Sequence, residues 1–136
     1  MSFWYLASPY SKYPKGTEAA FQDAAKQAAL LVLAGIPTFC PIAHSHPLVP
    51  YVPMTKDNHD TWLGLDNAFM DSAYGMILCE MEGWDESFGI KHEIAYMRKL
   101  GKPIIYMKEG IIPAILLDRT GKYRKPDNYV LRQAGY

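Results

Sequence analysis

The stretch "YGMILCEMEGWDESFGIKHEIAYMRKLGKPIIYM", residues 74–107, contains two apolar runs on either side of a helical segment. The runs "YGMILC" (74–79) and "PIIYM" (103–107) have the length and apolar composition of buried strands. Between them, residues 88–100 have a helix-forming composition and end at Gly101, which suits a helix C-terminus. A strand, a helix and a second strand in this order predict a right-handed crossover between parallel strands.

The residues before this stretch repeat the alternation of strand and helix. The run "FWYLA" (3–7) predicts a short buried strand. Residues 17–35 predict a helix, with Thr17 able to cap its start and Gly35 suited to the position after its end. The run "IPTFC" (36–40) predicts a second short strand, and its proline favours the edge of a sheet.

Further segments complete the pattern of elements. We expect a loop over the proline-rich residues 41–58 and a helix over 59–73, where apolar residues recur at positions 62, 65, 69 and 73. Residues 111–117 are compatible with a short helix or a strand. The predicted fold class is therefore α/β, with a doubly wound parallel sheet of four to five strands in the order 2-1-3-4-5 and helices on both faces.

Length and charge limit the classes of protein to which the chain can belong. At 136 residues it is long enough for one domain. Its 14 basic and 14 acidic residues cancel, which leaves no excess positive charge for binding a nucleic acid polymer. No apolar run approaches the roughly 20 residues that cross a membrane, and the N-terminus lacks the basic segment of a signal peptide. We therefore expect a cytoplasmic protein with neither a nucleic acid nor a membrane partner.

Basic residues gather in the last part of the chain. We expect one α/β domain over residues 1–118 and a basic tail over 119–136. The tail fits an arm that packs on a neighbouring subunit, where Asn128 would complete that subunit's site. A fifth strand of the sheet and a disordered end are the alternatives.

A ligand site is expected where the winding of the sheet reverses. In doubly wound sheets, ligands bind beyond the carboxyl ends of the strands at this point. In the expected order, Ser8, Pro9 and Tyr10 follow the first strand here, and residues 79–87 follow the third. These segments therefore form the candidate binding site.

The segment after the third strand carries the pattern S-x-G-x-x-x-E at Ser87, Gly89 and Glu93. Ser87 can cap the helix, and Gly89 leaves backbone N–H groups uncovered in its first turn, where a phosphate or hydroxyl can bind. Glu93 stands one turn further, about 6 Å along the axis, which is close to the span of a ribose from its 5′ oxygen to C1′. A sugar anchored at the helix start can thus present C1′ to Glu93, although most helical glutamates are simply solvated.

Asp66 supplies a second carboxylate near the same site. It lies between Trp62 and Phe69 in helical spacing, at the margin of the apolar face of its expected helix. Two carboxylates beside a cleft are what cleavage of a glycosidic bond requires, one to attack or stabilise C1′ and one to protonate the leaving group. The alternative for Asp66 is an exposed position on the helix surface.

Several of these motifs occur together in one known group of proteins. The runs "FWYLASPYS" (3–11), "HSHP" (44–47) and "WDESFGIKHEIAYMRKLGKPIIY" (84–106), with a helical aspartate eight residues before "YGMILC", resemble the nucleoside 2-deoxyribosyltransferase superfamily. That superfamily includes the deoxynucleoside 5′-monophosphate N-glycosidases. The resemblance covers roughly residues 3–108 and is closest to a branch of small bacterial and phage proteins.

The resemblance implies a flavodoxin-like fold, a homo-oligomer of two or more subunits, and no metal or organic cofactor. It implies an N-glycosidase or deoxyribosyltransferase whose small-molecule partner is a nucleoside or a nucleoside 5′-monophosphate. Glu93 corresponds to the nucleophile at C1′. Asp66 corresponds to the residue that holds or protonates the base.

The resemblance also assigns contacts around these two carboxylates. Ser87 and Gly89 correspond to the pair that contacts the 5′ phosphate, and Tyr5 or Tyr10 corresponds to the tyrosine that orients the glutamate. The acidic segment 80–86 departs from the family pattern. Because clustered carboxylates repel a phosphate, this departure leaves open whether the substrate carries one.

The region of the expected loop contains histidines that admit two interpretations. His44, His46 and His59 with Asp60 could bind zinc, iron or manganese, which would make the protein a metal-dependent phosphohydrolase. Alternatively, His44 and His46 line the ligand site and contact a base, to which Tyr51, Trp62 and Trp84 could add aromatic faces unless these rings are core residues. A third hypothesis is a nucleotide-binding module without catalysis, but such a module does not need two carboxylates. The presence of both therefore favours an enzyme.

Overall fold

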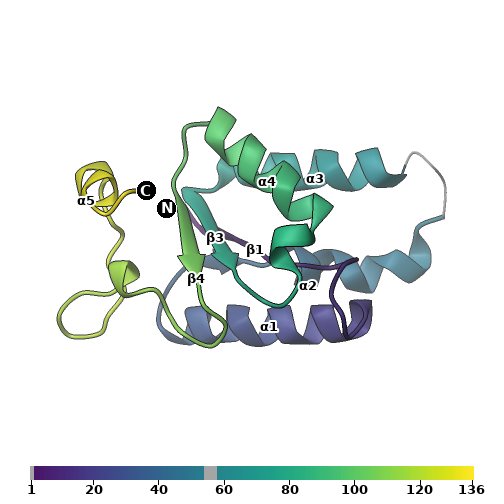
Figure 1. Cartoon of the computed structure of the whole chain (residues 1–136), viewed down its shortest axis with the longest axis horizontal. Coiled ribbons are helices and arrows are strands. Elements are labelled where there is room, and N and C mark those ends of the chain that lie inside the picture. Colours follow the sequence, from purple (N-terminus) through teal and green to yellow (C-terminus); the bar gives the residue numbers. More distant parts are fainter. Residues whose placement is uncertain (1, 54–57) are drawn as a thin grey trace.

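The computed structural model describes residues 2–53 and 58–136, and its core is a parallel sheet (Figure 1). The four strands are β1 (Trp4–Ala7), β2 (Thr38–Phe39), β3 (Gly75–Cys79) and β4 (Ile104–Met107). They are ordered β2-β1-β3-β4, and every neighbouring pair is parallel. The predicted α/β class and the place of the first strand between the second and third are confirmed, and this order is that of a flavodoxin-like fold. Among the described residues the sheet has no fifth strand.

Helices cover both faces of the sheet, as predicted (Figure 1). Helix α1 (Thr17–Leu33) lies on one face, and α3 (Asn58–Ser72) and α4 (Phe88–Lys99) lie on the other. Successive side chains of a strand point to opposite faces, so Trp4 packs in the core beside α1 and Tyr5 packs in the core beside α3 and α4. In the described residues no helix has both the length and the apolar character needed to cross a membrane.

The two ends of α1 test the predicted caps. Gly16, with a φ of +93°, occupies the N-cap position, so Thr17 is the first helical residue and the prediction that it caps the helix is wrong. Because a positive φ favours glycine, the turn into the helix falls on Gly16. The C-terminal end follows the prediction: Gly35 has a φ of +81°, and the N–H of Ile36 donates to the carbonyl of Leu31 at 3.0 Å.

The segment expected to be a loop over residues 41–58 is largely helical. Its described part forms α2 (Pro41–Ser45) and a 3₁₀ helix, η1 (His46–Tyr51). Each has a proline in its first turn, where the missing N–H costs no helical hydrogen bond. The prediction of a loop was therefore wrong for this part, and positions 54–57 lie outside the described residues.

The C-terminal tail packs on its own chain. It follows the 3₁₀ helix η3 (Ala114–Leu116), the segment that the sequence left open between helix and strand, and it ends in α5 (Asn128–Gln133). Leu131 of α5 is 2% exposed and belongs to the core on the α1 side of the sheet. The indole Nε1 of Trp4 donates to the hydroxyl of Tyr123 at 3.1 Å. The alternative of a fifth strand is wrong, and contact with a neighbouring subunit stays a prediction.

Candidate active site

A cavity of about 320 Å³ opens between the segments that follow β1 and β3, where the sequence predicts a ligand site. Seven of the predicted site residues line it: Ser8, Tyr10, His46, Asp66, Ser87, Gly89 and Glu93. Pro9, between the first two, is buried rather than part of the lining. The volume is near the lower end of the range for small-molecule sites, about 300–1,000 Å³. The strand order therefore gathers residues that are far apart in the sequence.

Glu93 lies in the second turn of α4 and is only 7% exposed. Its carboxylate accepts a hydrogen bond from the hydroxyl of Tyr5, which is fully buried in β1. Burial raises the pKa of Glu93 to about 8; the Tyr5 hydrogen bond opposes this rise and the negative charge of Asp66 adds to it. Burial, followed by the charge of Glu93, also raises the pKa of Tyr5 well above its usual value, so the phenol stays protonated and donates.

Among the described residues, no cation pairs with the carboxylate of Glu93. In residues 2–53 and 58–136, none of the ion pairs formed by lysine, arginine or histidine includes this carboxylate. A buried carboxyl without a cationic partner is unusual, and perturbed carboxyls of this kind gather at functional sites. Glu93 is therefore the first candidate for the chemistry of this cavity.

Asp66 brings a second carboxyl group to the same cavity from α3. Its side chain is partly buried and lines the cavity, so the alternative of a solvated surface aspartate does not describe it. Burial raises the pKa of Asp66 to about 6. With the two pKa values on either side of 7, the pair holds about one proton at neutral pH. Such a pair can both donate a proton and present a negative charge.

The start of α4 has the predicted cap. Ser87 is buried, and its Oγ accepts a hydrogen bond from the N–H of Ile90 at 3.2 Å. Gly89 is exposed, and among the described residues a Cβ at this position would meet only the Oγ of Ser87, at 3.8 Å. The missing side chain thus leaves space beside the helix start, where unpaired N–H groups and the helix dipole favour an anionic or hydroxyl group.

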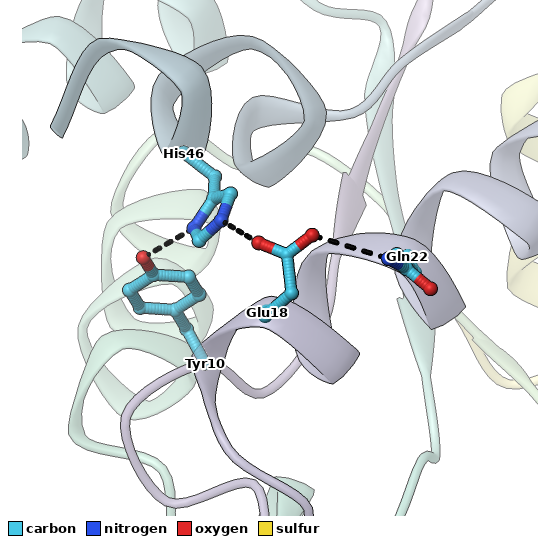
Figure 2. A network of polar contacts seen from close by, with 4 residues as sticks. All are labelled: Tyr10, Glu18, Gln22 and His46. Atoms are coloured by element: carbon cyan, nitrogen blue, oxygen red, sulfur yellow. Dashed lines mark hydrogen bonds and ion pairs between the residues drawn. The ribbon is translucent and has the colours of Figure 1, made fainter. Parts of the chain in front are cut away.

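Tyr10 and His46 belong to a hydrogen-bond network in one wall of the cavity (Figure 2). The Tyr10 hydroxyl lies 2.7 Å from Nδ1 of His46, and Nε2 of His46 lies 2.8 Å from Oε2 of Glu18. Gln22 donates to the other oxygen of Glu18 at 3.1 Å. Tyr5 rather than Tyr10 is therefore the tyrosine bonded to Glu93. Sequence reasoning missed Glu18 because its partner lies 28 residues away and reaches it only in the fold.

Three predicted binding residues lie elsewhere in the described chain. His44 is exposed, with its ring centroid 5.8 Å from that of Phe39. Trp84 packs edge-on against Tyr106, with 5.8 Å between the ring centroids. Asn128 lines a separate hollow between α5 and the end of α4. A role for Asn128 in the site of a neighbouring subunit stays a prediction.

The histidines do not form a shared metal site in the described residues. There, no group of three or more histidine, cysteine, aspartate or glutamate side chains is placed to hold a metal ion. His44 contacts Phe39, His46 bonds Tyr10 and Glu18, and the ring of His59 lies 5.5 Å from that of Phe88. The ligand set that the phosphohydrolase alternative requires is therefore not assembled from these three side chains.

The rest of the cavity wall is mostly apolar, and Ser11, Ser45 and His59 are its polar members. The apolar lining residues are Pro41, Ile42, Val49, Trp62, Leu63 and Phe88. The sequence suggested Trp62 as one possible aromatic face, with an ordinary core position as the alternative, and Trp62 does line the cavity. The positions on α2 and η1 carried no signal, because that segment was expected to be a loop. The cavity thus combines two carboxyl groups with a mostly apolar wall.

One family matches the chain. The family described as "Domain of unknown function (DUF1937)" matches residues 2–109, a range that contains all four strands and every residue lining the cavity. Comparison with curated proteins gives no match. The chain therefore belongs to the DUF1937 family, and the cavity with its two carboxyl groups lies within the family's domain.

Proposed function

We propose that the protein breaks the N-glycosidic bond of a nucleoside or nucleoside 5′-monophosphate, by hydrolysis or by transfer of the sugar to another base. The observation that carries this proposal is Glu93, a buried carboxyl that borders an open cavity, accepts a hydrogen bond from Tyr5 and feels the charge of Asp66. Enzymes that cleave glycosidic bonds commonly use a pair of carboxyl groups on either side of the bond. The resemblance to the nucleoside 2-deoxyribosyltransferase superfamily points to the same reaction.

Each group at the cavity has a task in this reaction. Glu93 attacks C1′ while the bond from C1′ to the base nitrogen breaks, and Asp66 donates a proton to the departing base. Water, or an N–H of a second base, then attacks C1′, its proton passes to the ionised Asp66, and the bond from C1′ to Glu93 breaks. The helix start at Ser87 and Gly89 binds the 5′ end of the sugar, and the apolar wall contacts the base.

The reaction needs one proton on the carboxyl pair, carried by Asp66. The pKa of Glu93 is about 8 with the Tyr5 hydrogen bond already included, and that of Asp66 is about 6, so in the free site the proton lies mainly on Glu93 and must pass to Asp66 when the substrate binds. The hydrogen bond from Tyr5 lowers the pKa of Glu93 and so stabilises the ionised form that attacks C1′. Tyr5 is therefore a positioning residue that also shifts the proton toward Asp66.

We further propose that the protein works in the cytoplasm as a homo-oligomer. Cys40 and Cys79 are both buried free thiols, which is ordinary in a reducing compartment. Asn128 lies away from the cavity of its own subunit, and an oligomer would bring it near the cavity of a neighbour. Light scattering on the purified protein measures the number of subunits, and a monomer at working concentration would contradict this part of the proposal.

The test is release of free base from a panel of ribonucleosides, deoxyribonucleosides and their 5′-monophosphates. We expect base release by the wild-type protein and a fall of at least about a hundredfold in Glu93→Gln, which keeps the shape of the side chain but not its charge. Glu86→Gln is the matched control, because Glu86 is an exposed glutamate just before the same helix. Equal rates in wild type and Glu93→Gln would remove Glu93 from the mechanism.

Two outcomes of the same assay favour the other hypotheses. Binding of nucleosides without release of base would favour the binding module. Loss of activity after dialysis against a chelator, with recovery on addition of zinc or manganese, would favour the metal-dependent phosphohydrolase. We expect activity to survive the chelator.

A further inference from the structure

The ring of His46 has partners on three sides in the cavity wall, and Figure 2 shows two of them, Tyr10 and Glu18. Its Nδ1 lies 2.7 Å from the Tyr10 hydroxyl, and its Nε2 lies 2.8 Å from Oε2 of Glu18. Phe21 stacks on the ring, with centroids 4.6 Å apart and an interplanar angle of 21°. These contacts fix the orientation of the imidazole, and the protonation of its partners fixes the direction of each hydrogen bond.

Glu18 decides which nitrogen of His46 carries a proton. The hydrogen bond from His46, followed by that from Gln22, lowers the pKa of Glu18 below its usual value, so Glu18 is ionised at neutral pH. An ionised carboxylate only accepts hydrogen bonds, so the proton of a neutral imidazole lies on Nε2. Nδ1 is then an acceptor, and the Tyr10 hydroxyl donates to it.

The Tyr10 hydroxyl therefore already donates its only proton, to Nδ1 of His46. The pKa of Tyr10 is raised by burial and, to a smaller extent, lowered by a hydrogen bond from the Thr17 hydroxyl to the phenol oxygen. The phenol oxygen retains a further lone pair, so toward a ligand in the cavity it acts only as an acceptor. A ligand group that meets Tyr10 must therefore carry a proton.

The rest of the cavity suits a neutral group of this kind. Ser8 lines the same cavity and is 6% exposed, yet its Oγ has no hydrogen-bond partner in the described part of the chain. Buried hydroxyls normally have a partner, and that of Ser8 can donate or accept. The described residues that line the cavity include the carboxyls of Asp66 and Glu93 and no lysine or arginine.

We propose that the Glu18–His46 pair holds Tyr10 as an acceptor for a hydroxyl group of the nucleoside sugar, so that Tyr10 determines specificity for a sugar with that hydroxyl free. A phosphate dianion or a fluorine atom in place of the hydroxyl has no proton to donate to Tyr10. Glu18 and His46 are positioning residues that set the direction of the hydrogen bond. This inference rests on the proposed function for the identity of the ligand.

The experiment compares hydroxyl and fluorine at single positions of the sugar. Kd is measured by calorimetry for the four 2′-deoxynucleosides in the Glu93→Gln background, which prevents turnover, and then for the 3′-fluoro and 5′-fluoro analogues of the one bound best. The measurement is made at pH 8.5. At one of the two positions we expect fluorine to weaken binding on the order of tenfold, as for loss of one hydrogen bond.

Glu18→Gln tests the direction of the network. A glutamine amide can donate to Nε2, which moves the imidazole proton to Nδ1 and frees the Tyr10 proton to face the ligand. The ratio of fluoro to hydroxyl Kd should then fall close to one, and Tyr10→Phe should lower it in the same way. Asp23→Asn, a change in the same helix at a residue bonded to Tyr13 instead, should keep the wild-type ratio.

The outcomes separate this inference from the proposed function. A ratio of fluoro to hydroxyl Kd near one at both the 3′ and 5′ positions, in protein with Glu18 intact, would overturn the inference. A ratio that stays unchanged in both Glu18→Gln and Tyr10→Phe would also overturn it. Base release by the wild-type protein together with either result would leave the proposed function standing. If the Kd ratios are as expected but the wild-type protein releases no base, the result supports the inference and contradicts catalysis.

Discussion

Glu93 binds its proton more tightly in the folded chain than in the unfolded chain. Burial raises its pKa from 4.5 to about 8, which corresponds to roughly 4–5 kcal/mol. Between these pH values the folded protein keeps a proton that the unfolded chain has lost. The contribution of Glu93 to stability is therefore complete below about pH 4.5 and is lost as the pH rises through about 8.

Glu93→Gln should remove this dependence on pH. The amide does not ionise and can still accept the hydrogen bond from Tyr5. The Tm of the wild-type protein should fall more steeply between pH 5 and 9 than that of the variant, and the variant should be the more stable protein at pH 9. Thermal unfolding followed by circular dichroism measures both. Parallel curves for wild type and Glu93→Gln would show that Glu93 does not titrate in this range.

Tyr5→Phe should raise the pKa of Glu93 further, because it removes the hydrogen bond that lowers this pKa. Activity that needs one proton on the pair gives a bell-shaped profile with limbs near pH 6 and 8. Because the Tyr5 hydrogen bond lowers the pKa of Glu93, its loss should move the alkaline limb to higher pH. Tyr13→Phe, which removes a hydroxyl bonded to Asp23, is the control and should leave the limbs in place. An unmoved limb in Tyr5→Phe would contradict the assignment.

The elements that carry the site depend on two glycines in different ways. At the start of β3, a Cβ on Gly75 would lie 2.7 Å from Cγ of Pro103 and 2.8 Å from the ring of Trp4. In the first turn of α4, a Cβ on Gly89 would meet, within the described part of the chain, only the Oγ of Ser87, at 3.8 Å. The glycine in the strand is therefore required by packing inside the protein, whereas the glycine in the helix leaves space that faces the cavity.

Gly75→Ala and Gly89→Ala form a matched pair that tests this difference. Overpacking at Gly75 should lower the free energy of unfolding by about 1–3 kcal/mol. Gly89→Ala should leave stability unchanged or slightly higher, since alanine favours a helix. Urea unfolding measures both effects. If the sugar binds at the helix start, Gly89→Ala should still raise KM, and an unchanged KM would place the sugar elsewhere.

At the scale of the whole molecule, helix α5 packs the tail against the core beside the sheet. Leu131 is 2% exposed in the α1-side core, whereas Tyr129 of the same helix is 71% exposed. Leu131→Ala should lower the free energy of unfolding by about 2–5 kcal/mol, because it empties a buried position. Tyr129→Ala should change it by less than about 0.5 kcal/mol. Equal, small effects would mean that the tail does not contribute to the core.

The elements of this protein were largely predictable from the sequence because they depend on near neighbours. Apolar runs and helical spacing identified the four strands and the helices α1, α3 and α4. The cap at Ser87 and the left-handed Gly35 were also predictable, since both arise from hydrogen bonds within a few residues. Pro41 of α2 and Pro47 of η1 misled the interpretation, because proline suits a loop and a first helical turn equally well.

The sequence by itself determined the α/β class and the helix that carries Ser87, Gly89 and Glu93, because these follow from periodicity and short spacings. Only the tertiary structure decided which tyrosine bonds Glu93: the alternation of side chains along β1 turns Tyr5 toward the side of α4. The pairing of Glu18 with His46 likewise depends on how α1 packs against the segment after β2. Such contacts join residues whose separation along the chain carries no information about their distance, so packing alone determines them.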